Sequence, residues 1–339
     1  MDIVTLGIDL AKNVFQLHGV NRAGKAIYKK RVRRTLLLRT VAQLPPCLIG
    51  VEACPGAHYW AREFAKFGHE VRLMGAQFVA PYRKGNKNDG NDAEAICEAV
   101  SRPSMRFVPT KSIEQQDMQM LQRIREQVIQ YRTALVNQIR GFLAERGIVL
   151  AKGITRARHE LPLVIENAEN ELSGLARELL AILREELRHL DAHVSSLDKR
   201  IIHQFSQNEA CARVAAISGV GVMTATAIVS SVGNARNFKN GRHLAAWLGL
   251  VPRQRASGDR SQLYGISRRG DKRLRSLLIH GARTVVHYAA KKHDRLSQWI
   301  NRLRAKRGTN VAAVALANKF ARWIWAILAK DEIYCPQAN

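Results

Sequence analysis

Cysteine is scarce in this chain, and its copies are scattered. Five occur among 339 residues, at Cys47, Cys54, Cys97, Cys211 and Cys335. No two of them have the short spacing of a metal-ligand pair, and their arrangement does not indicate a disulfide framework. We therefore expect reduced thiols with a structural role, in a protein of the cytoplasm.

Acidic residues are also few. Asp and Glu number 28 against 54 Lys and Arg, which gives a formal charge of +26. Such a charge is typical of proteins that bind a polyanion, and nucleic acid is the default partner. An anionic membrane surface is the competing partner, but no amino-terminal signal pattern is present. The most apolar late stretch, 311–328, contains Lys319 and Arg322, so we expect a soluble protein of two or three domains with no membrane partner.

The first hundred residues predict three strands in a meander, followed by strands that alternate with helices. An apolar strand at 3–12 is interrupted by Asp9, and another at 47–54 by Glu52. An unpaired carboxylate in a buried strand costs several kcal/mol, so each acid should have a cation, a hydrogen-bond network or a strand end open to solvent. The order is that of ribonuclease-H-like nucleases. The other predicted elements are strands at 14–20, 26–32 and 70–74 and helices at 36–43 and 58–67.

Two further acids open the next helix. Asp89 stands where an N-cap would, and Asp92 follows three residues later, so both side chains can point to one helix end. On its own this pattern favours a capped helix with a solvated acidic first turn over a metal site. Together with the two strand acids, however, it predicts a cluster that binds a pair of Mg²⁺ ions, or Mn²⁺ in their place. A chance collection of four acids is the weaker account, because two of them interrupt apolar strands.

Residues 115–205 are almost wholly helical and carry two apolar seams with heptad spacing. The seams predict an antiparallel helical pair within the chain, a coiled coil between chains, or both, and the spacing does not choose among these. Gly147, Gly153 and Pro162 mark the break between the seams. The first seam is Leu121, Ile124, Val128, Tyr131, Leu135, Gln138 and Phe142, and the second is Leu180, Leu183, Leu187, Leu190, Val194, Leu197 and Ile201.

The last third combines a glycine turn with basic segments. Gly219 and Gly221 fit a helix-hairpin-helix whose backbone N–H groups bind phosphate, although a tight helix connection explains them nearly as well. Ser257 follows in a small-residue loop, where it is either a nucleophile on a phosphodiester or a phosphate contact. Asp259 is the only acid in that loop. The candidate nucleic-acid contacts are Gly219, Gly221, Arg253, Arg255, Arg260, Arg268, Arg269, Lys272 and Arg273.

Taken together, these motifs resemble one known family along nearly the whole chain. The motifs are Gly7-Ile8-Asp9, Val51-Glu52-Ala53-Cys54, His58 to Arg62, Lys87 to Ile96, Ile217 to Gly221, Gly249 to Pro252, Ser257-Gly258 and Gly265 to Gly270. Their order and spacing resemble those of the DEDD transposases of bacterial insertion sequences, family one-ten, which are relatives of the Piv DNA invertase.

The resemblance implies a fold and a set of site residues. It implies an α/β RuvC-like domain over 1–110, a helical coiled-coil or dimerisation region over 111–207, and a mainly helical transposase domain over 208–339. The acidic tetrad maps onto Asp9, Glu52, Asp89 and Asp92. The serine nucleophile maps onto Ser257, with Ser261 as the nearest competitor. Some relatives have Thr in place of Asn88, a difference that leaves the acids unchanged.

A mechanism is also implied by this resemblance. Family members use a structured non-coding RNA, called a bridge or seeker RNA, that pairs with donor and target DNA. Two dimers are thought to assemble into a tetramer with composite sites of acids and serine from different subunits, at the bacterial nucleoid. The sequence leaves open the RNA, the donor and target sites, and whether the chain transposes or inverts DNA.

Two other classes of function fit the same residues. A RuvC-like structure-specific nuclease needs only the four acids, and Ser257 would then contact a phosphate. A non-enzymatic nucleic-acid binding protein needs only the glycine turn and the basic loops. Replacing Ser257 separates the recombinase from the nuclease, and replacing the acids tests the binding protein.

Overall fold

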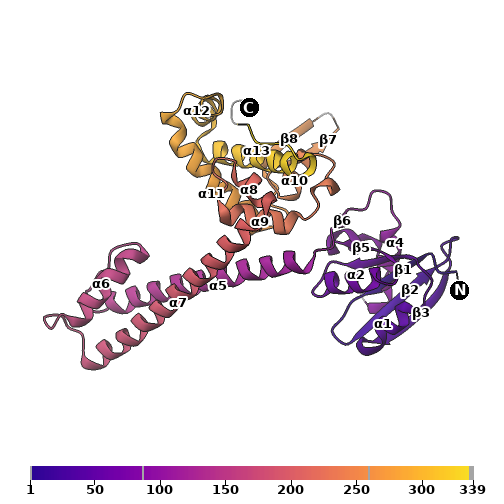
Figure 1. The fold of residues 1–339 in the computed structure, drawn as a ribbon, viewed down its shortest axis with the longest axis horizontal. Helices are drawn as coiled ribbons and strands as arrows, with labels where there is room; N and C mark the ends of the chain where they lie inside the picture. The colour runs from indigo at the N-terminus through magenta and orange to yellow at the C-terminus, as the bar shows by residue number, and fades with distance from the viewer. Residues whose placement is uncertain (1, 86–87, 259, 336–339) are drawn as a thin grey trace. The chain divides into compact units, whose positions relative to one another are not determined.

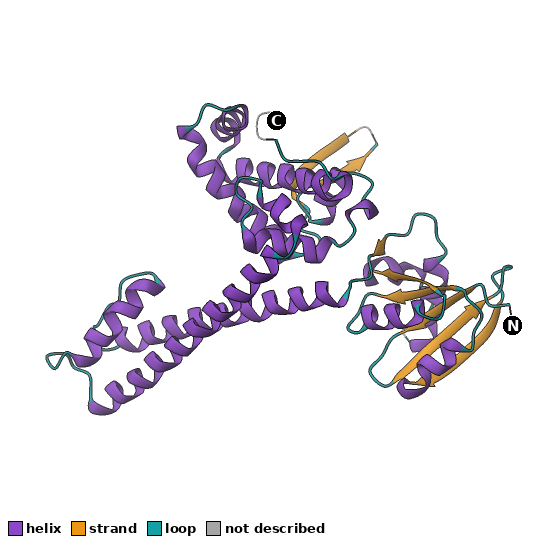
Figure 2. Ribbon diagram, in the orientation of Figure 1, coloured by secondary structure: helices purple, strands orange, loops and turns teal. Residues whose placement is uncertain are grey.

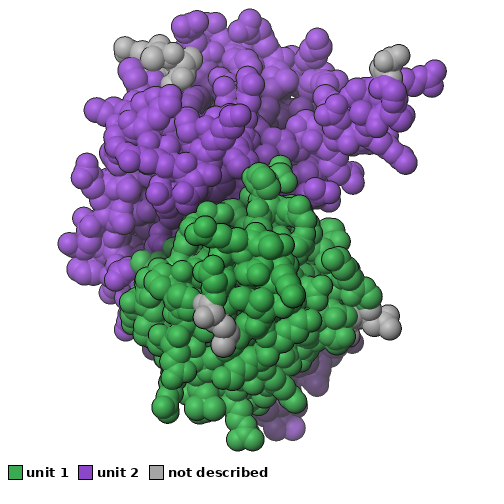
Figure 3. Space-filling model, turned by 90° about the vertical axis from the view of Figure 1, so that its right-hand side faces the viewer, with its two compact units in different colours: residues 1–113 green, residues 114–339 purple. Residues whose placement is uncertain are grey.

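The computed structural model describes residues 2–85, 88–258 and 260–335. Two compact units make up the chain, residues 1–113 and residues 114–339 (Figure 3). Each unit has a core of its own, and each is described here by itself.

The first unit is an α/β domain (Figure 1). Its strands are β1 (Thr5–Asp9), β2 (Val14–Val20), β3 (Ala26–Arg33), β4 (Leu48–Glu52), β5 (Glu70–Met74) and β6 (Phe107–Val108). Its helices are α1 (Arg34–Ala42), α2 (Ala57–Ala65), α3 (Ala76–Val79), the short 3-10 helix η1 (Ala80–Tyr82) and α4 (Asp89–Val100).

These strands form one mixed sheet in the order β3-β2-β1-β4-β5-β6. Strands β1 to β3 pair antiparallel as a meander, whereas β1, β4 and β5 run parallel. The sequence prediction of a meander followed by alternating strands and helices, as in a ribonuclease-H-like domain, is therefore confirmed. The short β6 adds an antiparallel edge strand that the sequence did not predict.

The two faces of the sheet are covered differently because side chains alternate along a strand. Leu6 and Ile8 lie in a core with Leu37 of α1 and Phe64 of α2. The other face of β1 receives α4, where the Cys97 thiol donates to the backbone carbonyl of Thr5. One central strand is thus buried on both sides, which explains its continuous apolar run.

The start of α4 differs by one residue from the prediction. Asn88, not Asp89, is the N-cap, and its side chain accepts a hydrogen bond from the backbone N–H of Asn91. Asp89 is the first helical residue, and Asp92 lies in the same first turn. Because both carboxylates sit beside unsatisfied backbone N–H groups, the helix dipole favours their negative charge.

The second unit is mainly helical (Figure 2). It begins with three helices, α5 (Ile113–Ala144), α6 (Ile154–Glu166) and α7 (Gly174–Ser206). Helices α5 and α7 run antiparallel, since Arg125 pairs with Asp198 while Arg132 pairs with Asp191, 3.1 Å away. Asp191 also pairs with Arg158 of α6, so one carboxylate ties the three helices together.

The two predicted seams behave differently. On α7, Leu180, Leu187, Leu190, Val194 and Ile201 are all buried within this unit. On α5, Leu135 is buried, but Ile124, Tyr131 and Phe142 are 44%, 55% and 52% exposed. The face of α5 that packs inside the unit is instead formed by Leu135, Val136, Ile139 and Leu143. The second seam therefore serves the fold of a single chain, whereas most of the first seam faces solvent.

The rest of the unit packs around one helical core. Its elements are α8 (Glu209–Ala215), α9 (Val222–Val232), η2 (Ala235–Asn237), α10 (Gly241–Trp247), β7 (Pro252–Ser257), β8 (Arg260–Ile266), α11 (Lys272–Tyr288), η3 (Ala289–Lys291), α12 (Arg295–Arg307) and α13 (Thr309–Lys330). Strands β7 and β8 pair antiparallel as a two-stranded hairpin. The prediction of a loop at 253–260 was therefore wrong, because alternating polar residues were read as irregular.

Helix α13 is the longest apolar helix of this core. Among the described residues it alone has the length and apolar character of a membrane span, with a mean hydropathy of 1.4. Within that window 44% of the residues are buried, and α13 packs against α10, α11 and α12. Its buried face, which includes Leu316, Phe320 and Ile324, forms part of the core of this unit.

Candidate active site

Two carboxylates lie next to each other at one edge of the sheet of the first unit. Ile8 pairs with Val51 in the parallel ladder of β1 and β4, and each strand ends one residue later, at Asp9 and Glu52. Carboxyl ends of neighbouring parallel strands form the usual ligand-binding edge of such a sheet. Both acids are half-buried there, which accounts for the acid that interrupts each apolar strand.

Glycine lets α4 come close enough to add the other two acids. Gly7 and Gly50 face each other across β1 and β4. A Cβ atom on Gly7 would lie 2.2 Å from the carbonyl oxygen of Ala93, and one on Gly50 would lie 2.7 Å from Cβ of Val100. Only glycine permits this approach, which brings the first turn of α4 to the edge that carries Asp9.

All four predicted acids line a single cavity of about 360 Å³. Asp9, Glu52, Asp89 and Asp92 come from three separate elements, so their convergence is a product of the fold. The sequence reasoning missed one further lining residue, Arg83, whose guanidinium lies 3.2 Å from the Asp92 carboxylate. No periodicity or motif points to Arg83, and only its place shortly before the acids could have drawn notice.

The cavity edge is electronegative. The pKa of the Cys54 thiol is raised, first by burial and then by the negative charges of Glu52 and Asp9. The negative charges of both strand acids therefore act on this one thiol. A thiol whose pKa is raised stays protonated near neutral pH and is a poor nucleophile and metal ligand.

Carboxylate oxygens are the donors that hard divalent cations prefer, so this set of side chains fits such an ion in kind. The described residues nevertheless include no group of three or more His, Cys, Asp or Glu side chains already gathered around one metal position. Arg83 is paired with Asp92 instead. A cation bound through Asp92 would thus compete with the Arg83 guanidinium for the charge of this carboxylate.

Ser257 lies in the second unit, at the end of β7 beside the tip of the hairpin. It pairs with Arg260 of β8 and is exposed, as are the other residues of β7. Gly258 follows with φ of +54°, a conformation that glycine adopts without strain. Asp259, the only acid in this segment of the sequence, lies outside the described residues.

The two candidate serines lie on opposite faces of the hairpin. Side chains alternate along β7, so Arg255 and Ser257 share a face, and Arg260 is the cross-strand neighbour of Ser257. Ser261 pairs with Ala256 on the other face, where its hydroxyl accepts a 2.8 Å hydrogen bond from the Gln254 amide. Ser257 therefore has the guanidinium neighbours, and Ser261 has an amide partner.

The root of the hairpin is held tightly to the C-terminal end of α10. A Cβ atom on Gly249 would lie 2.0 Å from the carbonyl oxygen of Arg269, and one on Gly270 would lie 2.0 Å from that of Trp247. The buried Arg275 guanidinium links these two segments, because it donates hydrogen bonds to the carbonyls of Leu248 and Arg269 at 3.1 and 3.0 Å. Sequence reasoning missed Arg275, since a basic residue in a basic helix carries no distinguishing signal.

The remaining predicted basic contacts differ in exposure. Arg253, Arg268, Arg269 and Lys272 are exposed, so each guanidinium or ammonium group is open to a phosphate. Arg268 also has φ of +56°, which is unusual for a residue other than glycine. Arg273 is engaged inside the unit.

Two contacts to α5 hold Arg273. Its guanidinium donates to Gln122 at 2.7 Å and lies 3.0 Å from the Glu126 carboxylate on α5. Gln122 is 1% exposed and donates in turn to the Thr226 hydroxyl. This chain of contacts joins α5, α9 and α11, so Arg273 has a structural role in addition to its proposed one.

The glycine turn joins α8 to α9, and its two glycines differ. Gly219 has φ of +91°, and a Cβ atom there would lie 2.8 Å from the carbonyl oxygen of Gly281 on α11. Gly221 is exposed at the start of α9, with open space where a Cβ atom would stand. Gly219 is therefore needed for helix packing, whereas Gly221 leaves backbone N–H groups accessible from solvent.

Comparison with known proteins agrees with both halves of this description. Residues 6–147 match a DEDD transposase family of the IS110 type, and residues 211–297 match the transposase IS116/IS110/IS902 family. A DEDD nuclease domain implies a divalent metal ion and an enzyme that cuts DNA.

Several curated relatives are transposases. A probable family 20 transposase of Pseudomonas aeruginosa is 46% identical over 337 residues, which cover 99% of this chain and 100% of the relative. The transposase for insertion sequence element IS1111A of Coxiella burnetii is 46% identical over 98% of this chain and 92% of its own length. The pilin gene-inverting protein of Moraxella bovis is a distant relative, 24% identical over 52% of this chain and 55% of its own length. The chain belongs to the IS116/IS110/IS902 family of transposases, with a DEDD domain at its amino-terminal end.

Proposed function

We propose that this transposase is an RNA-guided recombinase that uses two sets of residues. The carboxylates of Asp9, Glu52, Asp89 and Asp92 would bind Mg²⁺, or Mn²⁺ in its place, and Ser257 would be the nucleophile. The observation that carries the proposal is the convergence of four acids from three elements on one cavity. Carboxylates that line one cavity repel one another unless cations offset their charge, and Arg83 pairs with only one of the four, Asp92.

Within the acid cavity, the carboxylate side chains would position the cation, and the cation would neutralise negative charge. Asp9 and Glu52 are fixed by the ends of two paired strands, and Asp89 and Asp92 by one helical turn. A bound divalent ion would supply charge neutralisation at the oxygens of a phosphodiester. Arg83 would be released from Asp92 on ion binding and could then hold a phosphate oxygen, since guanidinium groups pair well with phosphate.

At the hairpin, Ser257 Oγ would attack the phosphorus atom. The new Oγ–P bond forms as the P–O bond to the departing strand breaks, and the hydroxyl proton passes to a base. Arg255 and Arg260 lie beside Ser257 and would stabilise the charge that develops on the phosphate. The described residues provide no hydrogen-bond partner for this hydroxyl, so the base must come with the nucleic acid, another part of the chain or another subunit.

We propose partners from the net charge of the chain and from its exposed apolar surface. The net charge of +26 suits donor and target DNA together with a structured guide RNA, at the bacterial nucleoid. The exposed seam on α5, which includes Ile124, Tyr131 and Phe142, suits a second copy of the chain, as expected for a homodimer that assembles into a tetramer. We propose that the chain is divided into a RuvC-like part (1–110), a dimerisation part (111–207) and a transposase part (208–339).

The acid half is tested by Asp92→Asn, which removes one ligand charge with little change of shape. We expect loss of strand cleavage with DNA and RNA binding retained, and the same loss for the wild type in excess chelator. Asp117→Asn on the long helix is a matched control outside the cavity and should cut normally. Full cleavage by Asp92→Asn would refute the metal-binding role.

The serine half is tested by trapping an adduct. A suicide DNA substrate with guide RNA should yield a covalent protein–DNA complex whose peptide map places the bond on Ser257. Ser257→Ala and Asp9→Ala should each abolish the adduct, and Ser261→Ala should retain it. If mixing the two inactive variants restores the adduct, the acids and the serine act from different subunits.

Two outcomes would select another function. Cleavage without an adduct in Ser257→Ala would identify a structure-specific nuclease in which Ser257 only contacts phosphate. Inversion of a segment between two sites, without movement to a new site, would place the protein nearer the pilin gene-inverting relative.

A further inference from the structure

A second cavity lies in the helical unit, far in sequence from the acids and lined by none of the residues of the hairpin. Its volume is about 500 Å³, within the range of small-ligand sites. It lies where the start of α10 meets α13, and a Cβ atom on Gly241 would lie 2.8 Å from Cα of Arg322. The lining side chains include Arg242, Lys319, Arg322, Trp323, Trp325 and Lys330.

The cavity has an excess of positive charge. Four of its lining residues are cations and one, Glu332, is a carboxylate. Glu332 lies 3.5 Å from Lys330. For Arg242, Lys319 and Arg322 the described residues supply no carboxylate partner. Burial lowers the pKa of Lys319, and the neighbouring charge of Arg322 lowers it further. Cations held together in this way favour an anion between them.

Tryptophan rings form part of the same wall. The Trp325 indole N–H donates to the carbonyl of Phe238 at 3.0 Å, which fixes the ring. Trp323 packs against Tyr334, with ring centroids 5.3 Å apart. The Lys319 ammonium lies 5.6 Å from the Trp323 ring centroid and 4.7 Å from that of Trp299. Oriented indole rings next to unpaired cations can take a flat, anionic ligand, with a ring to stack and a phosphate to neutralise.

We propose that this cavity binds a nucleotide of a single-stranded nucleic acid, with its phosphate on Arg242, Lys319 and Arg322 and its base against Trp323 or Trp325. Duplex DNA fits less well, because its bases are already stacked and are not available to indole rings. Single-stranded segments arise both in a structured RNA and in DNA during strand exchange. The shared chemistry is that of an unpaired base beside its phosphate.

The proposal is independent of strand cleavage and is tested by binding alone. Full-length protein is titrated, with chelator present, into fluorescently labelled oligouridylate and oligothymidylate, and anisotropy gives each Kd. Trp323→Leu should weaken binding by about 5- to 150-fold, as loss of one stacked base does. Arg322→Gln should weaken binding and lower the salt dependence by about one phosphate contact.

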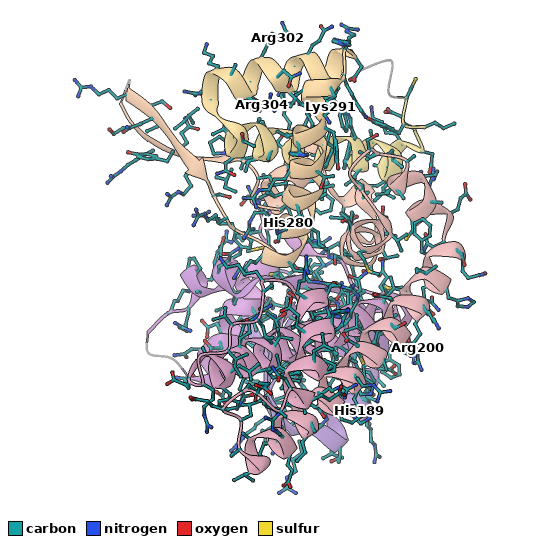
Figure 4. The ribbon with its side chains drawn as sticks, turned by 90° about the vertical axis from the view of Figure 1, so that its left-hand side faces the viewer. His189, Arg200, His280, Lys291, Arg302 and Arg304 are labelled. Carbon is teal, nitrogen blue, oxygen red and sulfur yellow. The ribbon has the colours of Figure 1, made fainter. Side chains whose placement is uncertain are left out.

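A matched control removes the same charge elsewhere. Arg302 lies exposed on α12 (Figure 4), and Arg302→Gln should leave both Kd and salt dependence unchanged. Equal losses in Arg302→Gln and Arg322→Gln would overturn the proposal, because a general charge effect would explain both. Tighter binding to oligouridylate identifies RNA as the source of the nucleotide, and tighter binding to oligothymidylate identifies DNA.

Crosslinking keeps the proposal testable if Trp323→Leu misfolds. Wild-type protein irradiated with an oligonucleotide that carries 5-iodouracil should give a crosslinked peptide from 319–330. Crosslinks confined to the β7–β8 hairpin would overturn the assignment. Displacement of the oligonucleotide by a polyglutamate peptide at lower concentration than by unlabelled oligonucleotide would also overturn it, in favour of an acidic protein partner.

Discussion

Gly7→Ala tests whether the acid cavity depends on the close packing of α4 on the sheet. The new Cβ atom would lie 2.2 Å from the carbonyl oxygen of Ala93 and 2.5 Å from the backbone nitrogen of Cys97. Both neighbours are helix backbone, which cannot rotate away as a side chain can. The helix, the strand or both must therefore shift.

The size of the shift follows from the contact distance. Ordinary van der Waals contact begins at 3.4 Å, so the Ala93 oxygen must retreat by 3.4 − 2.2 = 1.2 Å. Overpacking of this kind costs about 1–3 kcal/mol of stability. Asp92 lies next to Ala93 and moves with it, away from Asp9 and Glu52. A misplacement of about 1 Å can cost roughly 100-fold in rate.

The assay compares strand-cleavage rate, DNA affinity and thermal unfolding of Gly7→Ala with those of wild type. We expect cleavage to fall by about 100-fold with DNA affinity retained, because the basic surfaces are untouched. Gly141→Ala is the control, since a Cβ atom there meets open space. Cleavage within twofold of wild type in a Gly7→Ala protein of unchanged melting temperature would refute this account of the cavity.

Two further predictions concern assembly and pH. Truncating Leu187, Leu190 and Val194 to Ala should lower the melting temperature, because it removes buried contacts worth about 2–5 kcal/mol for each Leu. Ile124→Ser combined with Tyr131→Ser should instead lower the mass measured by light scattering and leave the fold intact, because both side chains are exposed. The reverse pattern would show that α7, not α5, joins subunits. Burial, followed by the charges of Lys111 and Arg62, lowers the pKa of His58 from 6.5 to about 4. Because the unfolded chain then binds a proton at higher pH than the folded chain, stability should fall as pH drops from about 6.5 towards 4. His58→Gln should flatten that slope in unfolding titrations, and an unchanged slope would assign it to other groups.

The α/β unit was largely predictable because its patterns are local. Strand-like runs of five to seven residues, in which apolar and polar side chains are mixed, gave β2 and β5 their observed bounds, 14–20 and 70–74. Each acid within an apolar run indicated a strand end, since charge is rarely tolerated deeper in a sheet. The partner of Asp92 was not predictable, because the position of Arg83 is set by the turn of η1 and the placement of α4.

The helical unit was predicted less well because heptad spacing shows which face of a helix is apolar but not which surface that face packs against. Both seams have heptad spacing, yet α7 buries its seam in the chain and α5 exposes most of its own. The face that α5 buries is displaced by about one residue from the predicted one, at Val136, Ile139 and Leu143. Gln122 lies on this displaced face at heptad spacing from Val136, is 1% exposed, and hydrogen bonds to Thr226 and Arg273. A polar residue buried by such a network is invisible to hydrophobic periodicity.

The hairpin bears on how Ser257, the proposed nucleophile, would be kept inactive. Ser257 stands exposed at the end of β7, with arginines beside it and no described partner for its proton. A serine hydroxyl is a weak nucleophile until a base accepts its proton. The root of the same hairpin is fixed by Arg275 and by glycines that allow no Cβ atom. The proposed role of Ser257 as a nucleophile therefore requires a base that assembly would supply, and the geometry that positions the serine would at the same time prevent uncontrolled DNA cutting.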